Sequence, residues 1–190
     1  MSGGHGGSDG HGGNKKVALL ISVLALLLAI SETLGKAAQT TTIAQNIEAA
    51  NYWSFFQAKT IRMTVLRTAA EDMETAAAAV DDAAQRARLE ARIDRWRKTA
   101  ERYDTEPETQ EGRRELAERA KAAQARRDRA EAAYHHFELG SAAFQIAIVL
   151  ASAAIVTGAS LLIGIGGLLG VVGAVMTAIG VFAPEAVHLF

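Results

Sequence analysis

An uncharged stretch of 46 residues, from Leu139 to Pro184, constrains the fold of this chain more than any other feature. It contains no Asp, Glu, Lys, Arg or His, and a water-soluble domain does not tolerate so long a run without charge. A helix needs about 20 apolar residues to cross a bilayer, so the stretch is too long for one span and suits two. We predict membrane helices at about 142–156 and 161–183, joined by a tight turn at 157–160.

Glycines inside this stretch raise an alternative, because "GIGGLLG" at residues 164–170 resembles the glycine fingerprint of dinucleotide-binding loops. That fingerprint requires a preceding strand, a polar-faced helix and a later acidic residue, and the flanks of this motif provide none of them. The same glycines, at 164–167, offer a second position for the turn between the two spans. Pro184 ends the second span, and residues 184–190 form a short tail.

Small residues recur every four positions in both predicted spans. They are Gly166, Gly170, Ala174 and Ala178 in the last span and Ala143, Ala147 and Ala151 in the one before it. Faces of this kind let membrane helices touch backbone to backbone. Two such faces exceed what one hairpin needs, so we predict contacts between subunits, the alternative being ordinary membrane glycine and alanine content.

A third apolar segment lies near the N-terminus. Lys15 and Lys16 precede the uncharged run from Val17 to Ser31, and residues 15–35 are long enough to span the bilayer. We predict an uncleaved anchor here, with a cleaved signal peptide as the alternative. Residues 1–14, rich in Gly and His, are expected to be disordered. The two lysines favour a cytoplasmic N-terminus.

The segment 36–140 holds all but two of the 20 basic residues and all but three of the 21 acidic residues. Apolar residues recur there at alternating spacings of three and four, which is typical of coiled coils. The predicted seams are Leu66, Ala69, Met73, Ala76 and Val80; Leu89, Ile93, Trp96, Ala100 and Tyr103; and Leu116, Ala120, Ala123, Arg127, Ala130, Tyr134 and Phe137. Pro107 lies between the last two, so we predict an antiparallel coiled-coil hairpin with its reversal near 105–112. The expected fold is an all-α membrane protein with three transmembrane helices and this hairpin inserted between the first and second.

The two arms of that hairpin have unequal lengths, since 36–104 is about twice as long as 108–140. We therefore expect a bend in the first arm, most readily at Thr40–Asn46 where three threonines weaken the helix, with a second bend possible near Asp81 and Asp82. The aromatic cluster that follows includes Trp53 and Phe56, which we predict to lie near the membrane interface or in a subunit contact. The alternative is that they belong to the core of the hairpin.

Several stretches resemble a family of bacterial membrane proteins known only as a domain of unknown function. The most specific marks are "NYWSFFQAKTIR" and "YHHFELGSAAFQIAI", and the likeness covers roughly residues 14–183. The resemblance implies a multi-pass protein of the bacterial inner membrane and implies no activity. This chain departs from the family at 157–160, where relatives carry basic residues.

Few residues are candidates for chemistry. Glu32 is the only charge in the first span, so it is either an ion ligand or a carboxylate at headgroup level paired with Lys36. Glu131 and His135 lie one helical turn apart but lack a third metal ligand. The chain has no cysteine, and its balanced charge gives no basis for binding nucleic acid. We expect no enzyme activity, cofactor or metal.

These observations predict an oligomeric scaffold in the inner membrane whose hairpin binds another copy or an unknown protein partner. Membrane lipid is the other expected partner. The alternative is a subunit of a transport, channel or ion-coupled complex, because three spans with a helical insertion also suit proton-driven motor subunits.

Overall fold

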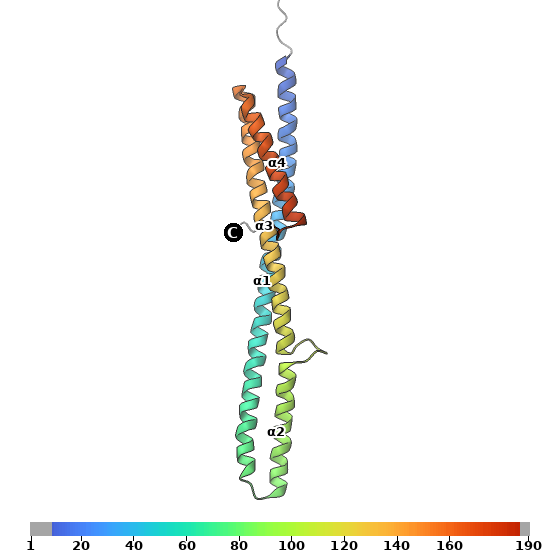
Figure 1. Ribbon diagram of the computed structural model, residues 1–190, viewed down its shortest axis with the longest axis vertical. Helices are drawn as coiled ribbons and strands as arrows, with labels where there is room; N and C mark the ends of the chain where they lie inside the picture. The colour runs from blue at the N-terminus through green and yellow to red at the C-terminus, as the bar shows by residue number, and fades with distance from the viewer. Residues whose placement is uncertain (1–8, 187–190) are drawn as a thin grey trace, which may run out of the picture. The chain divides into compact units, whose positions relative to one another are not determined.

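The computed structural model describes residues 9–186 and is all α-helical over that range (Figure 1). Its four helices are α1 (Asp9–Ala78), α2 (Ala83–Asp104), α3 (Arg113–Thr157) and α4 (Ser160–Phe182). The first of them begins inside the segment expected to be disordered, and residues 1–8 lie outside the described range. The helices divide into two compact units. A three-helix unit combines the chain up to Ile43 with the chain from Arg127 onward, and a hairpin unit comprises Ala44–Arg126.

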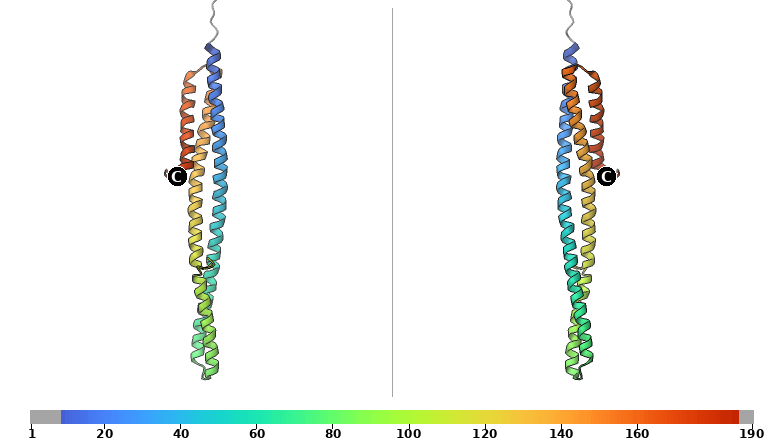
Figure 2. Two further views of the ribbon diagram at one scale, coloured as in Figure 1. Left: turned by 90° about the vertical axis from the view of Figure 1, so that its right-hand side faces the viewer. Right: turned by 90° about the vertical axis from the view of Figure 1, so that its left-hand side faces the viewer.

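In the three-helix unit, α4 folds back on α3 after a two-residue connection (Figure 2). Gly158 takes a positive φ of 73° there, a conformation that glycine adopts without strain, so the turn lies inside the expected stretch 157–160. Leu24 of α1 packs with Phe144 and Ala147 of α3 in the core of this unit. Ser31 is also buried, and its hydroxyl donates to the backbone oxygen of Phe137 at 3.0 Å.

In the hairpin unit, α1 runs antiparallel first to α2 and then to the beginning of α3. Arg97 of α2 pairs with Glu74, whereas Arg119 of α3 donates to the Tyr52 hydroxyl at 2.6 Å. The core near the tip contains Ala70, Ala77 and Ile93, with Met73, Leu89 and Trp96 packed against it. As residue numbers fall along α1, those of its partners rise, so both later helices form a single returning arm (Figure 1).

The predicted position of the reversal was therefore wrong. The chain reverses between α1 and α2, where Asp82 caps α2 by accepting from the backbone N–H groups of Ala84 and Gln85. The segment 105–112 is a loop that joins two helices running in the same direction (Figure 1). Proline correctly marked the end of a helix, but a helix end does not specify the direction that the chain takes next.

The helix was also expected to weaken at Thr40–Asn46, but α1 continues through that stretch without interruption. The hydroxyls of Thr40, Thr41 and Thr42 each donate to the carbonyl four residues earlier, which keeps them within the helical pattern. Two positions of the seam on α1 differ from the prediction, since Ala70 and Ala77 are buried where Ala69 and Ala76 were expected, whereas Met73 packs on the core as predicted.

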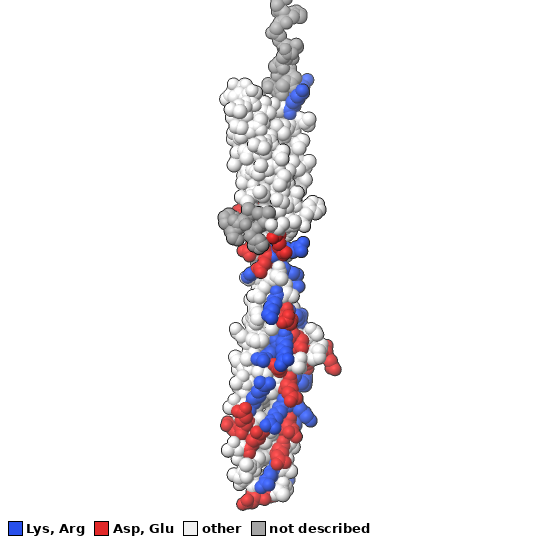
Figure 3. Space-filling view, in the orientation of Figure 1, with Lys and Arg blue, Asp and Glu red and all other residues white. Residues whose placement is uncertain are grey.

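Three helices contain stretches long and apolar enough to cross a membrane. They lie within Lys15–Ala78, Arg113–Thr157 and Ser160–Phe182. These segments indicate a multi-pass membrane protein. Charged side chains gather over α2 and the first part of α3, whereas the visible surface of the apolar stretches in the three-helix unit is almost free of them (Figure 3).

Candidate functional site

The small-residue faces of the spans are occupied by contacts within the chain. A Cβ atom on Gly166 would lie 3.0 Å from the Ala147 backbone oxygen, and one on Gly170 would lie 2.6 Å from Leu24. Ala143, Ala147 and Ala151 are buried, Ala174 packs on the core and Ala178 is exposed. These contacts account for most of both faces within a single chain, so the faces give no separate support for a contact between subunits.

The aromatic residues singled out in the sequence lie in the hairpin unit. Trp53 and Phe56 are half-buried and meet edge to face, with ring centroids 5.4 Å apart. The Arg113 guanidinium of α3 lies 6.0 Å from the Phe56 ring centroid. Phe56 thus contacts the returning arm, which is the alternative that the sequence left open, and Trp53 packs against Phe56 on the same helix.

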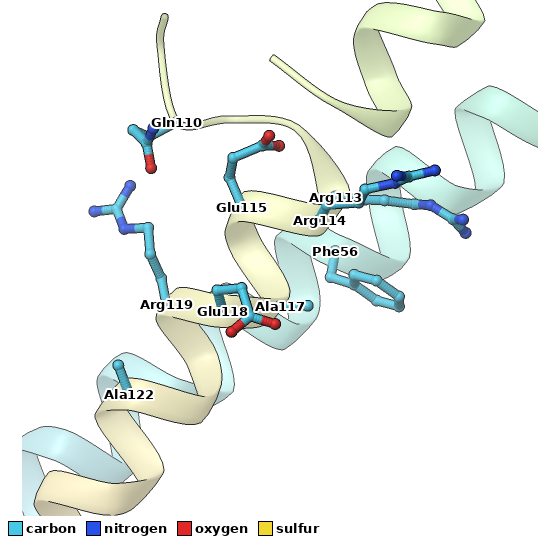
Figure 4. Close-up of a pocket in the computed structure, with 9 residues that line it drawn as sticks. All are labelled: Phe56, Gln110, Arg113, Arg114, Glu115, Ala117, Glu118, Arg119 and Ala122. Atoms are coloured by element: carbon cyan, nitrogen blue, oxygen red, sulfur yellow. The ribbon is translucent and has the colours of Figure 1, made fainter. Parts of the chain in front are cut away.

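A groove of about 690 Å³ lies beside the loop 105–112 (Figure 4). Phe56 comes from α1, and the other residues lining the groove come from the loop and from the start of α3. The polar groups that line it bond mainly to neighbouring side chains outside the lining. Arg113 donates to Asp104 at 2.6 Å, and Glu115 accepts from the Thr105 hydroxyl at 2.6 Å.

These contacts perturb the carboxylates that hold the loop. Burial acts to raise the pKa of Asp104, but Arg113 and Arg114 outweigh it and hold that pKa below its usual value. A hydrogen bond from Arg102 lowers the pKa of Glu106, and one from Thr105 lowers that of Glu115. All three carboxylates therefore stay ionised at neutral pH and act as structural acceptors. A catalytic acid or base would instead need a pKa near neutrality.

The candidate ion ligand Glu32 is exposed. Its carboxylate accepts a hydrogen bond from the Gln145 side chain of α3 at 3.3 Å, and no described contact joins it to Lys36. His136, one of the two adjacent histidines, is buried, with its Nε2 3.1 Å from the Pro184 backbone oxygen. Among residues 9–186 there is no group of three side chains suited to a metal ion.

One feature of α1 was missed in the sequence and stands out in the structure. Six uncharged residues in the hairpin unit are all exposed and lie at alternating spacings of four and three. They are Ile47, Asn51, Ser54, Ala58, Ile61 and Val65, which we call the outer stripe. The alternating spacing alone could have revealed it.

Comparison with known proteins adds a family. A family model described as a domain of unknown function, DUF4337, matches residues 13–183. The chain belongs to the DUF4337 family. The resemblance stated from the sequence is thereby confirmed, and membership in the DUF4337 family carries no activity with it. No curated protein and no solved structure matches the chain.

Proposed function

We propose that this DUF4337 protein is a membrane-anchored scaffold whose helical hairpin associates with a second copy through the outer stripe of α1. Its role is structural rather than catalytic. The observation that carries the proposal is the exposure of large apolar side chains along that stripe. Ile47, Ile61 and Val65 are each more than half exposed, and Phe55 beside them is 62% exposed.

Charge supports the choice of a second copy. From Ala44 to Ala69, α1 has only four charged residues in 26, whereas α2 has eleven in 22. Because this part of α1 carries few charges, a charged partner would find few groups there with which to form ion pairs. Since the chain's formal net charge is only −1, copies do not repel one another. Burying one Ile or Val side chain contributes about 1.5–3 kcal/mol, so a few such residues on each copy provide a substantial driving force.

The spacing of the stripe also suits a parallel pair. Isoleucine, valine and alanine at alternating spacings of three and four form a coiled-coil seam, and a single Asn at such a position favours one register. Asn51 occupies that place in the stripe. Membrane anchoring supports the same geometry, because copies inserted with one topology point the same way.

The first test introduces a charge. Ile61→Glu in the full-length protein, solubilised in detergent, should weaken self-association by at least tenfold, measured as the concentration dependence of mass by light scattering. Ala87→Glu adds the same charge at an exposed site on α2 and should leave association unchanged. A monomeric wild-type protein, or an Ile61→Glu variant of undiminished size, would contradict the proposal.

The second test identifies the partner and its direction. The chain has no cysteine, so a single Asn51→Cys substitution gives an unambiguous cross-link. In a parallel pair the two introduced thiols face each other, and mild oxidation of membranes should give a disulfide dimer. Ala87→Cys should remain monomeric. An antiparallel pair, or a different protein on the stripe, would leave the Asn51→Cys variant uncross-linked.

The proposed topology places the N-terminus in the cytoplasm, on the argument from Lys15 and Lys16. Three spans then put the hairpin and the C-terminus on the opposite side of the inner membrane. A reporter fused after Phe190 that is active only outside the cytoplasm should be active. Activity of a cytoplasm-specific reporter at the same position would reverse the orientation.

A further inference from the structure

A groove in the three-helix unit lies where the apolar part of the chain ends. It has a volume of about 420 Å³ and is formed by α1 and α3. Charge first reappears at Glu32 on α1 and at Glu138 on α3, after the uncharged runs of the two helices. Charged side chains at the end of a span lie at the level of the lipid headgroups. The groove is therefore accessible to those headgroups.

The residues lining the groove combine one cation with two carboxylates. Lys36 and Glu32 are four residues apart on α1, and Glu138 and Ser141 are three apart on α3, so each pair shares one face of its helix. The Lys36 ammonium makes no ion pair or hydrogen bond with any residue that the structure describes. The two carboxylates make only long contacts with their neighbours. Gln145 lies 3.3 Å from Glu32, and the His135 ring lies 3.8 Å from Glu138.

Ser141 is an independent indication of a ligand. It is only 8% exposed and lines the groove, yet its hydroxyl bonds to nothing within residues 9–186. Serine in a helix ordinarily donates to the carbonyl four residues earlier, as Ser152 does here. The Ser141 hydroxyl is therefore free to donate into the groove, where an acceptor from outside the chain can bond to it.

We propose that this groove binds the headgroup of a zwitterionic phospholipid that carries a primary ammonium group. Lys36 and the Ser141 hydroxyl are donors for the phosphate oxygens. Glu32 and Glu138 are acceptors for the N–H groups of the ammonium. Exposed Ile146 and Val149 continue along α3 from the groove and provide a surface for the acyl chains.

The charge of the groove discriminates among headgroups. An anionic headgroup such as phosphatidylglycerol matches Lys36 but meets two carboxylates without a cation to offer them. Phosphatidylcholine has the required charges, but its trimethylated nitrogen has no N–H group to donate. Phosphatidylethanolamine satisfies both the phosphate donors and the carboxylate acceptors, so the groove favours it over the other two.

The test measures lipid retention by the full-length protein in detergent. Native mass spectrometry with phosphatidylethanolamine, phosphatidylcholine and phosphatidylglycerol of identical acyl chains should show the ethanolamine lipid bound at least fivefold more. Lys36→Gln and Ser141→Ala should each reduce that preference to twofold or less. Lys16→Gln removes the same charge at the other end of the span and should leave it unchanged. Circular dichroism verifies that every variant remains folded.

Equal retention of the three lipids, or an unchanged preference in both groove variants, would overturn the proposal. Soluble glycerophosphoethanolamine distinguishes a lipid from a free phosphoamine. At the same concentration it should neither bind nor displace the lipid, because it lacks the acyl chains. Binding of the soluble compound without retention of the lipid would overturn the assignment to a membrane lipid.

Discussion

Gly173 lies where α4 packs tightly against α3 in the three-helix unit. A Cβ atom there would be 2.9 Å from the Phe144 ring and 3.0 Å from the Gly140 backbone oxygen. Phe144 is fully buried, and the backbone of α3 cannot move away without disturbing the core. The small residue is thus required by the packing of α4 on α3.

Replacing Gly173 with leucine should destabilise the three-helix unit by about 1–3 kcal/mol, the usual cost of overpacking a tight contact. Thermal unfolding of the detergent-solubilised protein measures the loss. Gly164→Leu is the matched control, because nothing lies within 4 Å of a Cβ atom there and both substitutions carry the same gain in helix propensity. Equal melting temperatures for the two variants would refute the packing argument.

The loop 105–112 is the element whose stability depends most directly on pH. The pKa values of Asp104, Glu106 and Glu115 are all lowered in the folded protein. Groups of this kind stabilise the fold at neutral pH, and their contribution is lost as the pH falls through their folded pKa values. The connection between α2 and α3 should therefore loosen in acid.

Asp104→Asn tests this contribution separately from the other carboxylates. The variant should be less stable than the wild type by about 0.5–1 kcal/mol at pH 7, and the difference should shrink below about pH 4, where an ordinary Asp is protonated. Melting curves followed by circular dichroism between pH 7 and pH 3 give both values. Asp94→Asn, at an exposed site on α2, should show no such difference. If the stability difference between Asp104→Asn and the wild type stayed constant with pH, the ionised carboxylate of Asp104 would not be its cause.

Among the elements, the sequence indicated which segments are helical more reliably than it indicated their connections. The turn after Thr157 could be located because the uncharged stretch has room for only two spans. The reversal at Asp82 was placed instead at Pro107, although the unequal lengths of the two arms already argued against a single return at that point. The two alanines of the α1 seam were each misplaced by one position because Ala69 and Ala70, like Ala76 and Ala77, are equally good candidates for burial.

The candidate sites were harder to predict for a related reason. Exposure of the outer stripe depends on which side of α1 faces the returning arm, and the sequence contains heptad spacing on both sides. Likewise, Lys36 was expected to pair with Glu32 by helical spacing, whereas Gln145 of α3 is the residue that reaches this carboxylate. Contacts between helices far apart in the sequence decide both cases.

For the molecule as a whole, the three apolar segments predict behaviour as an integral membrane protein. Alkaline carbonate washing strips proteins held to membranes by charge and leaves those that span the bilayer. The full-length protein should remain in the membrane pellet after this wash and enter solution only with detergent. Its release into the supernatant would contradict the multi-pass assignment.

The position of the chain reversal also sets the order in which contacts become available during synthesis. The tip of the hairpin, where Arg97 meets Glu74, is complete as soon as α2 has been made. The contact of Arg119 with Tyr52 spans 67 residues, and that of Arg126 with Gln45 spans 81. Each closes only a short additional loop once the contact before it has formed, so its entropic cost is small. The contacts of the hairpin can therefore form one after another from its tip while the ribosome is still producing α3, before either of the last two membrane segments has been made.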